Sequence, residues 1–165
     1  MKGLDLELLR WMRTHGHSPG IEDAAIALGK AGNNGLIWFI LGATLAVIDN
    51  GRWESWLICA LLGPVAIGLN YVVKLAVKRP RPVLEGLPPL GGAPSSLSFP
   101  SAHATSSFAA AAALGRVEPR ASAPLHALAT AIAVGRPYLG MHYPSDVLAG
   151  ALIGIALGLI VPLTF

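Results

Sequence analysis

Apolar and polar positions alternate along the chain in long blocks, and most of the apolar blocks carry no charge. The blocks predict helices over residues 36–48, 56–77, 102–114, 121–134 and 147–165. Uncharged apolar helices are typical of membrane proteins, because a helix satisfies its own backbone hydrogen bonds inside lipid. We therefore expect an all-α fold, an integral-membrane helical bundle with about five membrane-embedded helices in a single domain over residues 1–165.

The first 31 residues follow a different, amphipathic pattern. Apolar positions in residues 4–14 recur at helical spacing while charged residues occupy the other face, which is typical of a helix in the membrane interface. Ser18 and Pro19 favour the start of a second short helix that runs to Lys30. We expect residues 1–31 to form interfacial helices. Four tryptophans suit interfacial anchoring: Trp11, Trp38, Trp53 and Trp56.

Composition supports a membrane location and narrows the choice of partners. Charged residues make up only 13% of the chain, whereas soluble domains carry roughly 25%. The net charge of +3 is small, and the basic residues lie beside apolar blocks, which suits phosphate and anionic lipid headgroups better than nucleic acid. Cys59 is the single cysteine, so no disulfide can form within the chain. We expect membrane lipids as partners and no nucleic acid.

The number of membrane crossings decides which loops share a side. If residues 36–48 cross once, the loops 78–101 and 135–145 emerge on the same side as the N-terminus. The loops 49–54 and 115–120 then emerge on the opposite side. Two loops that are far apart in the sequence, and rich in polar residues, are thereby brought together.

These two loops and the helix ends beside them hold residues suited to binding phosphate. Arginine offers bidentate geometry and lysine a mobile charge, so Lys74, Arg81 and Arg136 suit phosphate oxygens. Ser101 precedes a helix whose free N–H groups and dipole also favour an anion. Each residue alone has a common structural role, such as a lysine that snorkels to the interface. Together they indicate a phosphate site.

Two histidines add reactive chemistry to this site. His142 lies four residues before Asp146, so the carboxylate can accept one imidazole N–H and leave the other nitrogen with its lone pair. A histidine oriented in this way is a nucleophile. His103, at the start of a predicted helix, offers a second imidazole that can give a proton to a leaving alcohol.

The order and spacing of these residues resemble the three-part signature of the type 2 phosphatidic acid phosphatase family, K-x6-R-P, P-S-G-H and S-R-x5-H-x3-D. The three parts fall on residues 74–82, 100–103 and 135–146, with every spacing matched. Ala102 stands in place of the usual glycine and Gly135 in place of the usual serine, so one methyl group is added beside the phosphate and one hydroxyl donor is lost. Neither departure touches the nucleophile or the proton donor.

The resemblance implies a mechanism. His142 would attack phosphorus to give a phosphohistidine, Asp146 would orient His142, and His103 would protonate the leaving oxygen. Phosphate would be held by cationic side chains and by the start of a helix, at Lys74, Arg81, Ser101, Ala102 and Arg136. No metal or other cofactor is implied, because the cationic side chains offset the charge of the transition state.

The short chain resembles the polyprenyl-linked members of the family. The first expectation for the substrate is a cell-envelope precursor such as decaprenylphosphoryl-5-phosphoribose, with undecaprenyl pyrophosphate and phosphatidylglycerophosphate as alternatives. Vanadium-dependent haloperoxidases share the pocket, but they are large and soluble, which the mean hydropathy of this chain, +0.58, disfavours. A further alternative is a membrane protein that binds phosphorylated lipid without catalysis.

Basic residues outside the pocket predict the membrane side of the site. Six lie on the face of the site, Lys2, Arg10, Arg13, Lys30, Lys78 and Arg79, and three lie opposite, Arg52, Arg116 and Arg120. This excess favours a cytoplasmic site under the positive-inside rule, whereas many bacterial members of the family face the periplasm. We expect Lys78 and Arg79, directly beside the pocket, to bind lipid headgroups.

Overall fold

A computed structural model describes residues 2–92 and 95–164, and within these ranges the chain forms helices and no strand. Met1 and Phe165, the outer ends of the predicted first and last segments, lie outside the described residues. The helices in chain order are α1 (Lys2–Thr14), α2 (Pro19–Ala31), the 3-10 turn η1 (Asn33–Gly35), α3 (Leu36–Ile48), α4 (Trp53–Val77), α5 (Ala102–Val117), the 3-10 turn η2 (Pro119–Ala121), α6 (Ser122–Tyr138) and α7 (Pro144–Ile160). The all-α prediction is confirmed for this part of the chain.

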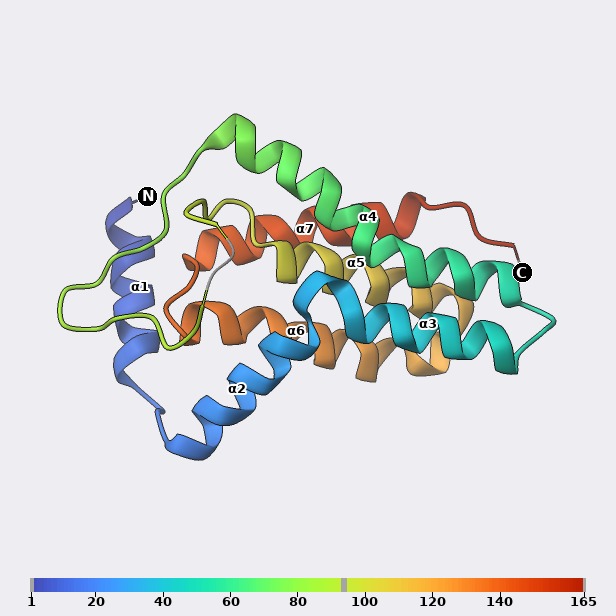
Figure 1. The fold of residues 1–165 in the computed structure, drawn as a ribbon, viewed down its shortest axis with the longest axis horizontal. Coiled ribbons are helices and arrows are strands. Elements are labelled where there is room, and N and C mark those ends of the chain that lie inside the picture. Colours follow the sequence, from blue (N-terminus) through green and yellow to red (C-terminus); the bar gives the residue numbers. More distant parts are fainter. Residues whose placement is uncertain (1, 93–94, 165) are drawn as a thin grey trace.

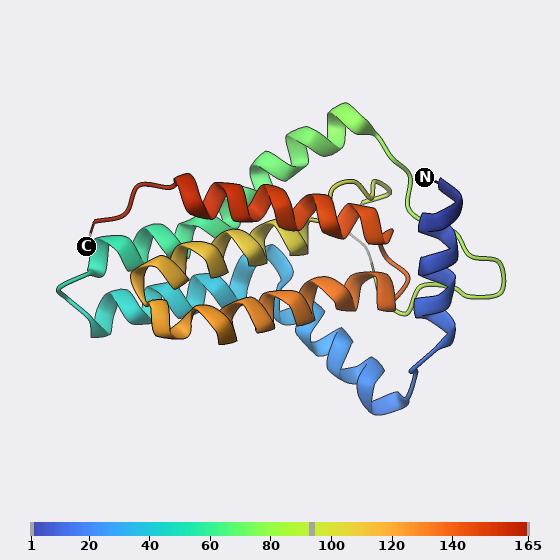
Figure 2. The ribbon, with the colours of Figure 1, turned by 180° about the vertical axis from the view of Figure 1, so that it is seen from behind.

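Helices α3 to α7 run along the long axis of the molecule, and α1 lies across one end of them (Figures 1 and 2). α5 packs against α4, α6 and α7, and α2 packs against α6. The core between them combines alanines with large apolar side chains, among which Trp38, Leu114 and Ile132 are almost completely buried. This packing fixes the helix ends from which the candidate site is built.

The two ends of the bundle hold the loops that the crossing pattern predicts. The N-terminus, the loop after α4 and the turn between α6 and α7 lie at one end, and the C-terminus and the other two turns lie at the opposite end (Figure 1). At the first end, Arg13 of α1 donates hydrogen bonds to the carbonyls of Pro88 and Tyr138, at 2.9 and 3.3 Å. The prediction that the two polar loops lie together is therefore confirmed.

α5 and α7 approach each other through small residues. Gly150, Gly154 and Gly158 of α7 are buried. A Cβ atom added to Gly154 would lie 2.4 Å from the carbonyl oxygen of Thr105, and one added to Gly158 would lie 2.5 Å from that of Ala109. The two helix backbones are therefore in direct contact, as the four-residue glycine spacing predicts. We call this contact the glycine seam.

Of the described helices, α4 is the one that is long and apolar enough to cross a membrane as a continuous helix. α2 and α3 would form a second span only as a broken pair with a bend of 52°, and α7 is apolar but shorter. The predicted count of five membrane-embedded helices is therefore not confirmed. The described residues form an all-helical bundle with at least one membrane-capable helix.

The helices agree with the predicted segments at their centres and differ at several ends. α3 has the predicted bounds, whereas α4 begins at Trp53, α5 continues to Val117 and α7 spans Pro144–Ile160. α6 continues to Tyr138, so Arg136 lies on its last turn instead of in a loop. The prediction ended this helix too early because a glycine and a proline near a helix end usually stop it, and neither does here.

The predicted interfacial role is wrong for two of the four tryptophans. Trp38 and Trp56 are buried in the core, and the indole N–H of each donates a hydrogen bond to a side chain of the protein. Trp11 and Trp53 are about half exposed, at 58% and 49%. Only these two have the exposure that an interfacial anchor needs.

Candidate functional site

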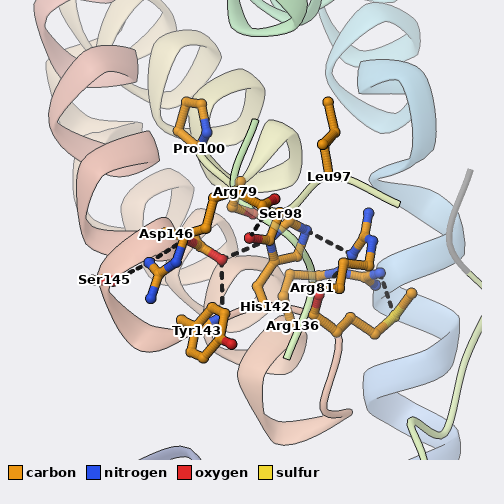
Figure 3. Close-up of polar contacts among 12 residues, drawn as sticks. Arg79, Arg81, Leu97, Ser98, Pro100, Arg136, His142, Tyr143, Ser145 and Asp146 are labelled. Atoms are coloured by element: carbon orange, nitrogen blue, oxygen red, sulfur yellow. Dashed lines mark hydrogen bonds and ion pairs between the residues drawn. The ribbon is translucent and has the colours of Figure 1, made fainter. Parts of the chain in front are cut away.

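His142 lies in the turn between α6 and α7, where it is 3% exposed. Its Nε2 atom is 3.3 Å from Nη1 of Arg81, which can only donate, so Nε2 presents its lone pair to that side (Figure 3). The proton then resides on Nδ1, which faces Oδ2 of Asp146 at 3.4 Å. Nδ1 makes no hydrogen bond within the described residues, so Asp146 is its nearest acceptor by charge rather than by a formed bond.

The environment of His142 keeps its imidazole neutral. Burial lowers the pKa of His142 to about 4, and the neighbouring cations Arg81 and Lys74 act in the same direction, against the opposing effect of Asp146. At neutral pH the ring is therefore uncharged and Nε2 keeps its lone pair. This is the protonation state that a nucleophilic histidine requires.

Asp146 is fully buried in the first turn of α7, and both of its carboxylate oxygens are occupied. Oδ2 accepts the backbone N–H of Tyr143 at 2.9 Å, and Oδ1 accepts a hydrogen bond from Arg79 at 2.7 Å. The backbone carbonyl of Asp146 accepts the N–H of Ser101 at 3.0 Å. This last bond ties the second part of the motif directly to the third.

The two predicted arginines near His142 differ in how firmly they are held. Arg81 donates from Nε to the carbonyl of Ser95 at 2.7 Å and from Nη1 to that of Met141 at 2.6 Å. Arg136 is 6% exposed, and its Nε has no hydrogen-bond partner among the described residues. A buried donor of this kind suits an anionic ligand, because it is costly to leave unpaired.

Lys74 has a different set of partners from the one expected. Its ammonium group donates to three backbone carbonyls, those of Leu97, Ser98 and Pro100, at 3.2, 3.1 and 2.9 Å. Lys74 therefore holds the segment that leads into α5, and it also lines the cavity beside His142. A direct contact between Lys74 and phosphate stays a prediction.

The start of α5 has the local structure that the motif predicts. Ser101 is the buried N-cap residue, and its hydroxyl oxygen lies 3.5 Å from the backbone N of Ala104. His103, two residues later, places Nε2 at 3.0 Å from the carbonyl of Gly29 and at 3.1 Å from Oδ1 of Asn33. A carbonyl can only accept, so in this arrangement Nε2 of His103 carries the proton.

A cavity of about 190 Å³ joins these elements. Its walls include six of the eight predicted site residues: Lys74, Arg81, Ala102, His103, Arg136 and His142. Ser101 and Asp146 are completely buried behind that wall. The cavity also reaches polar residues that the sequence did not single out, Asn33, Asn34, Asn70 and Tyr71.

Comparison with known proteins assigns the family. The family model of the PAP2 superfamily matches residues 53–165, which include all three parts of the motif. The chain belongs to the PAP2 superfamily. The resemblance deduced from the motif is therefore confirmed.

Relatives within the PAP2 superfamily cover most of the chain. Decaprenylphosphoryl-5-phosphoribose phosphatase of Mycobacterium tuberculosis is 38% identical over 144 residues, which are 87% of this chain and 80% of that protein. The crystal structure of Aquifex aeolicus LpxE superposes with a TM-score of 0.74 at 30% identity, over 95% of this chain and 93% of that one.

A second PAP2 structure supports the fold alone. The transmembrane PAP2 type phosphatidylglycerolphosphate phosphatase from Bacillus subtilis superposes with a TM-score of 0.76 at 22% identity, over 96% of this chain and 83% of that one. The helices of this chain are therefore arranged as in that transmembrane PAP2 protein.

One basic residue beside the cavity has a different partner from the one that the sequence predicts. Arg79, expected to bind lipid headgroups, instead donates a hydrogen bond to Asp146 (Figure 3). It donates another to Asp5. Asp5 belongs to α1, far away in the sequence, so no local pattern could have predicted the contact. The expectation for Lys78 is not tested by any contact.

Proposed function

We propose that this protein is a membrane phosphatase that hydrolyses a lipid-linked phosphate ester through a phosphohistidine on His142. The observation that carries the proposal is the state of His142, a buried neutral imidazole whose Nε2 lone pair faces Arg81 in the wall of a cavity that Arg136 also lines. The same cavity holds His103. A nucleophile, cationic groups for the phosphate and a proton donor thus share one small volume.

The reaction proceeds in two balanced steps. In the first, a bond forms between Nε2 of His142 and phosphorus, the bond from phosphorus to the leaving oxygen breaks, and His103 supplies the proton for that oxygen. In the second, water attacks phosphorus and gives a proton back to His103, the bond between phosphorus and Nε2 of His142 breaks, and inorganic phosphate leaves. Arg81 and Arg136 offset the charge on the phosphate oxygens, and the first N–H groups of α5 add to this effect.

For the substrate we propose a phosphoribosyl lipid of the decaprenylphosphoryl-5-phosphoribose type. The relative of that name matches over 80% of its own length, and the cavity adds an independent argument. Beside the cationic groups, the wall contains the amides of Asn33, Asn34 and Asn70. Amide groups pair with sugar hydroxyls, which a simple polyprenyl phosphate lacks.

Asn70 has a fixed orientation that suits a hydroxyl group. The hydroxyl of Thr105 donates to the Ser101 carbonyl at 3.0 Å, so its oxygen must accept from the amide NH₂ of Asn70 at 2.8 Å. Oδ1 of Asn70 is then left as a buried acceptor with no partner in the described residues. A sugar hydroxyl can donate to it, whereas a phosphate dianion offers no proton.

We also propose that α3 to α7 are all membrane-embedded and that the site faces the cytoplasm. Apolar side chains on the outside of α4 and α7, such as Val72 and Leu152, are more than half exposed, as lipid contact requires. The side of the membrane rests on the excess of basic residues at the site end. Reporter fusions at the C-terminus, which lies at the opposite end of the bundle, should report the periplasm, and a cytoplasmic C-terminus would reverse the orientation.

The experiment for the catalytic proposal is a phosphate-release panel with purified protein. It compares polyprenyl phosphates, polyprenyl diphosphates, a phosphoribosyl lipid and phosphatidylglycerophosphate, with His142→Ala as the blank. His126→Ala is the matched control, because His126 bonds to Ser122 within its own helix, away from the site.

We expect the fastest turnover with the phosphoribosyl lipid and none with His142→Ala. Asn70→Leu should lose the preference for the phosphoribosyl lipid over the simple polyprenyl phosphate. If the protein hydrolyses only phosphatidylglycerophosphate, or only a polyprenyl diphosphate, the proposed substrate is wrong. Equal phosphate release by wild type and His142→Ala would overturn the catalytic proposal and favour a protein that only binds lipid.

A further inference from the structure

We propose that Arg79 and Asp5 form a positioning pair for Asp146 and His142, so that helix α1 is part of the catalytic assembly. This inference rests on the proposed function of His142. Arg79 occupies a variable position within the first part of the motif, and Asp5 lies outside the motif. Neither residue lines the cavity beside His142.

Arg79 holds the carboxylate of Asp146 from behind. Its Nη1 lies 2.7 Å from Oδ1 of Asp146 and 2.7 Å from the hydroxyl oxygen of Ser145 (Figure 3). The centre of the guanidinium group lies 3.8 Å from the centroid of the Tyr143 ring. The guanidinium is therefore fixed by the same turn that carries His142, and it leaves Oδ2 of Asp146 on the side of the imidazole.

Asp5 completes the arrangement from α1. One of its oxygens, Oδ2, accepts a hydrogen bond from Nη2 of Arg79 at 2.7 Å and one from the hydroxyl of Ser145. The other, Oδ1, accepts the backbone N–H of Ser145 at 3.0 Å, one of the N–H groups at the start of α7 that lack a partner in their own helix. Asp5 thus anchors both Arg79 and the first turn of the helix that carries Asp146.

The charge state of Asp5 supports this role. Burial alone would raise the pKa of Asp5, but the hydrogen bonds from Ser145 and Arg79 outweigh burial and lower it. Asp5 is therefore an anion at neutral pH. Arg79 lies between two carboxylates, so each of its Nη atoms has a charged partner within the protein.

The pair also controls the charge that His142 experiences. A buried carboxylate without a cation favours a protonated neighbour, because an unpaired charge is costly inside a protein. Without Arg79, Asp146 would draw a proton onto His142 and remove the lone pair that attacks phosphorus. The other charged or titratable groups around His142 and Asp146 come from different elements and would remain: Lys74, Arg81, His103 and Arg136.

α1 also has an exposed apolar face. Leu4, Leu8 and Trp11 are exposed by 73%, 44% and 58%, on the helix whose Leu9 is completely buried. An apolar exposed face of this kind suits the membrane interface. α1 therefore lies between the bilayer surface and the residues that position the nucleophile.

The test uses full-length Arg79→Gln, Arg79→Lys and Asp5→Asn, with Glu7→Gln as the matched control. Glu7 is an exposed carboxylate on the same helix. For each protein we would measure kcat, KM and the pH profile of kcat/KM, with the lipid phosphate that wild type hydrolyses fastest, and the thermal midpoint. His142→Ala serves as the blank.

We expect Arg79→Gln to lower kcat by roughly tenfold to a hundredfold, with a smaller change in KM, and to move the acid limb of kcat/KM to higher pH. Arg79→Lys should recover part of both, Asp5→Asn should show a smaller effect in the same direction, and Glu7→Gln should match wild type. If Arg79→Gln does not fold, Asp5→Asn carries the test, because it leaves Arg79 in place.

Two outcomes would overturn the positioning pair while the proposed function stands. One is a rise in KM at unchanged kcat, which would make Arg79 a headgroup contact. The other is a loss of kcat with an unmoved acid limb, which would make the pair a purely structural support. Equal phosphate release by wild type and His142→Ala would instead overturn the proposed function, and the positioning pair with it.

Discussion

The site end of the bundle and the glycine seam are built in opposite ways. At the site end, side chains from α1, two loops and the starts of α5 and α7 meet through hydrogen bonds and ion pairs, as at Arg79 and Asp146. Along the seam, α5 and α7 meet through backbone, with glycine where a side chain would collide. The site end therefore holds the residues proposed to react, and the seam sets how closely α5 and α7 pack. A change at the first should cost activity, and a change at the second should cost the fold.

Asp146→Asn should have the largest effect on activity. The amide NH₂ of asparagine can donate to Nδ1 of His142, which would place the ring proton on Nε2 and remove the attacking lone pair. By analogy with the buried aspartate of serine proteases, we expect kcat to fall by about 10³-fold to 10⁴-fold. Phosphate release and thermal midpoint measured on the same sample check this. A kcat within tenfold of wild type would show that Asp146 does not orient the nucleophile.

Gly154→Ala should break the seam and reduce stability. Its Cβ would lie 2.4 Å from a backbone oxygen of α5, which cannot move aside as a side chain could. We expect a loss of about 1–3 kcal/mol in the free energy of unfolding. Denaturation of the protein in detergent measures this loss.

The matched control for the seam is Gly68→Ala. Gly68 lies on α4 with no atom within 4 Å of an added Cβ, so the change should leave stability equal or slightly higher. Equal stability of Gly154→Ala and wild type would mean that the seam opens without cost, and the contrast between the two regions would fail.

How far the sequence predicts the molecule differs between these two regions. The glycine spacing of the seam and the three-part motif are local patterns, so both were predictable, as were the bounds of α3. Asp5 and Arg79 are separated by 74 residues and carry no pattern that links them, so their contact was not. Lys74 was predicted to bind phosphate from its charge, but the sequence does not reveal the three carbonyls that surround it.

The pH dependence of stability should show the buried state of His142. The pKa of His142 is about 4 in the folded protein and about 6.5, the ordinary value, in the unfolded chain. Between pH 6.5 and pH 4, therefore, only the unfolded chain binds a proton at His142. Stability should therefore fall as pH drops from 6.5 toward 4, by at most about 1.4 kcal/mol per pH unit for this one group. Unfolding of wild type and His142→Gln across this range measures it. Parallel curves would contradict the buried neutral ring.

Gly29→Ala should have the smallest effect and should act on the site alone. The added Cβ would lie 2.5 Å from Nη1 of Arg136, the mobile end of a side chain, so the arginine should shift and the fold should not. We expect a loss of about 1 kcal/mol of transition-state stabilisation, roughly fivefold in kcat/KM, with an unchanged thermal midpoint. Gly20→Ala, where an added Cβ meets no atom within 4 Å, is the control on the same helix. A lower midpoint for Gly29→Ala would show that the position also serves packing.

The seam reaches the site at one point, where the N–H of Ser101 bonds to the carbonyl of Asp146 at 3.0 Å and a Cβ on Gly150 would lie 2.6 Å from the Ser101 carbonyl oxygen. This amide can exchange its hydrogen with solvent only when α5 and α7 separate. Its exchange rate should therefore be among the slowest in the chain and should report opening of the whole bundle rather than of a local loop. The cavity beside His142 is thus attached at its base to the glycine seam.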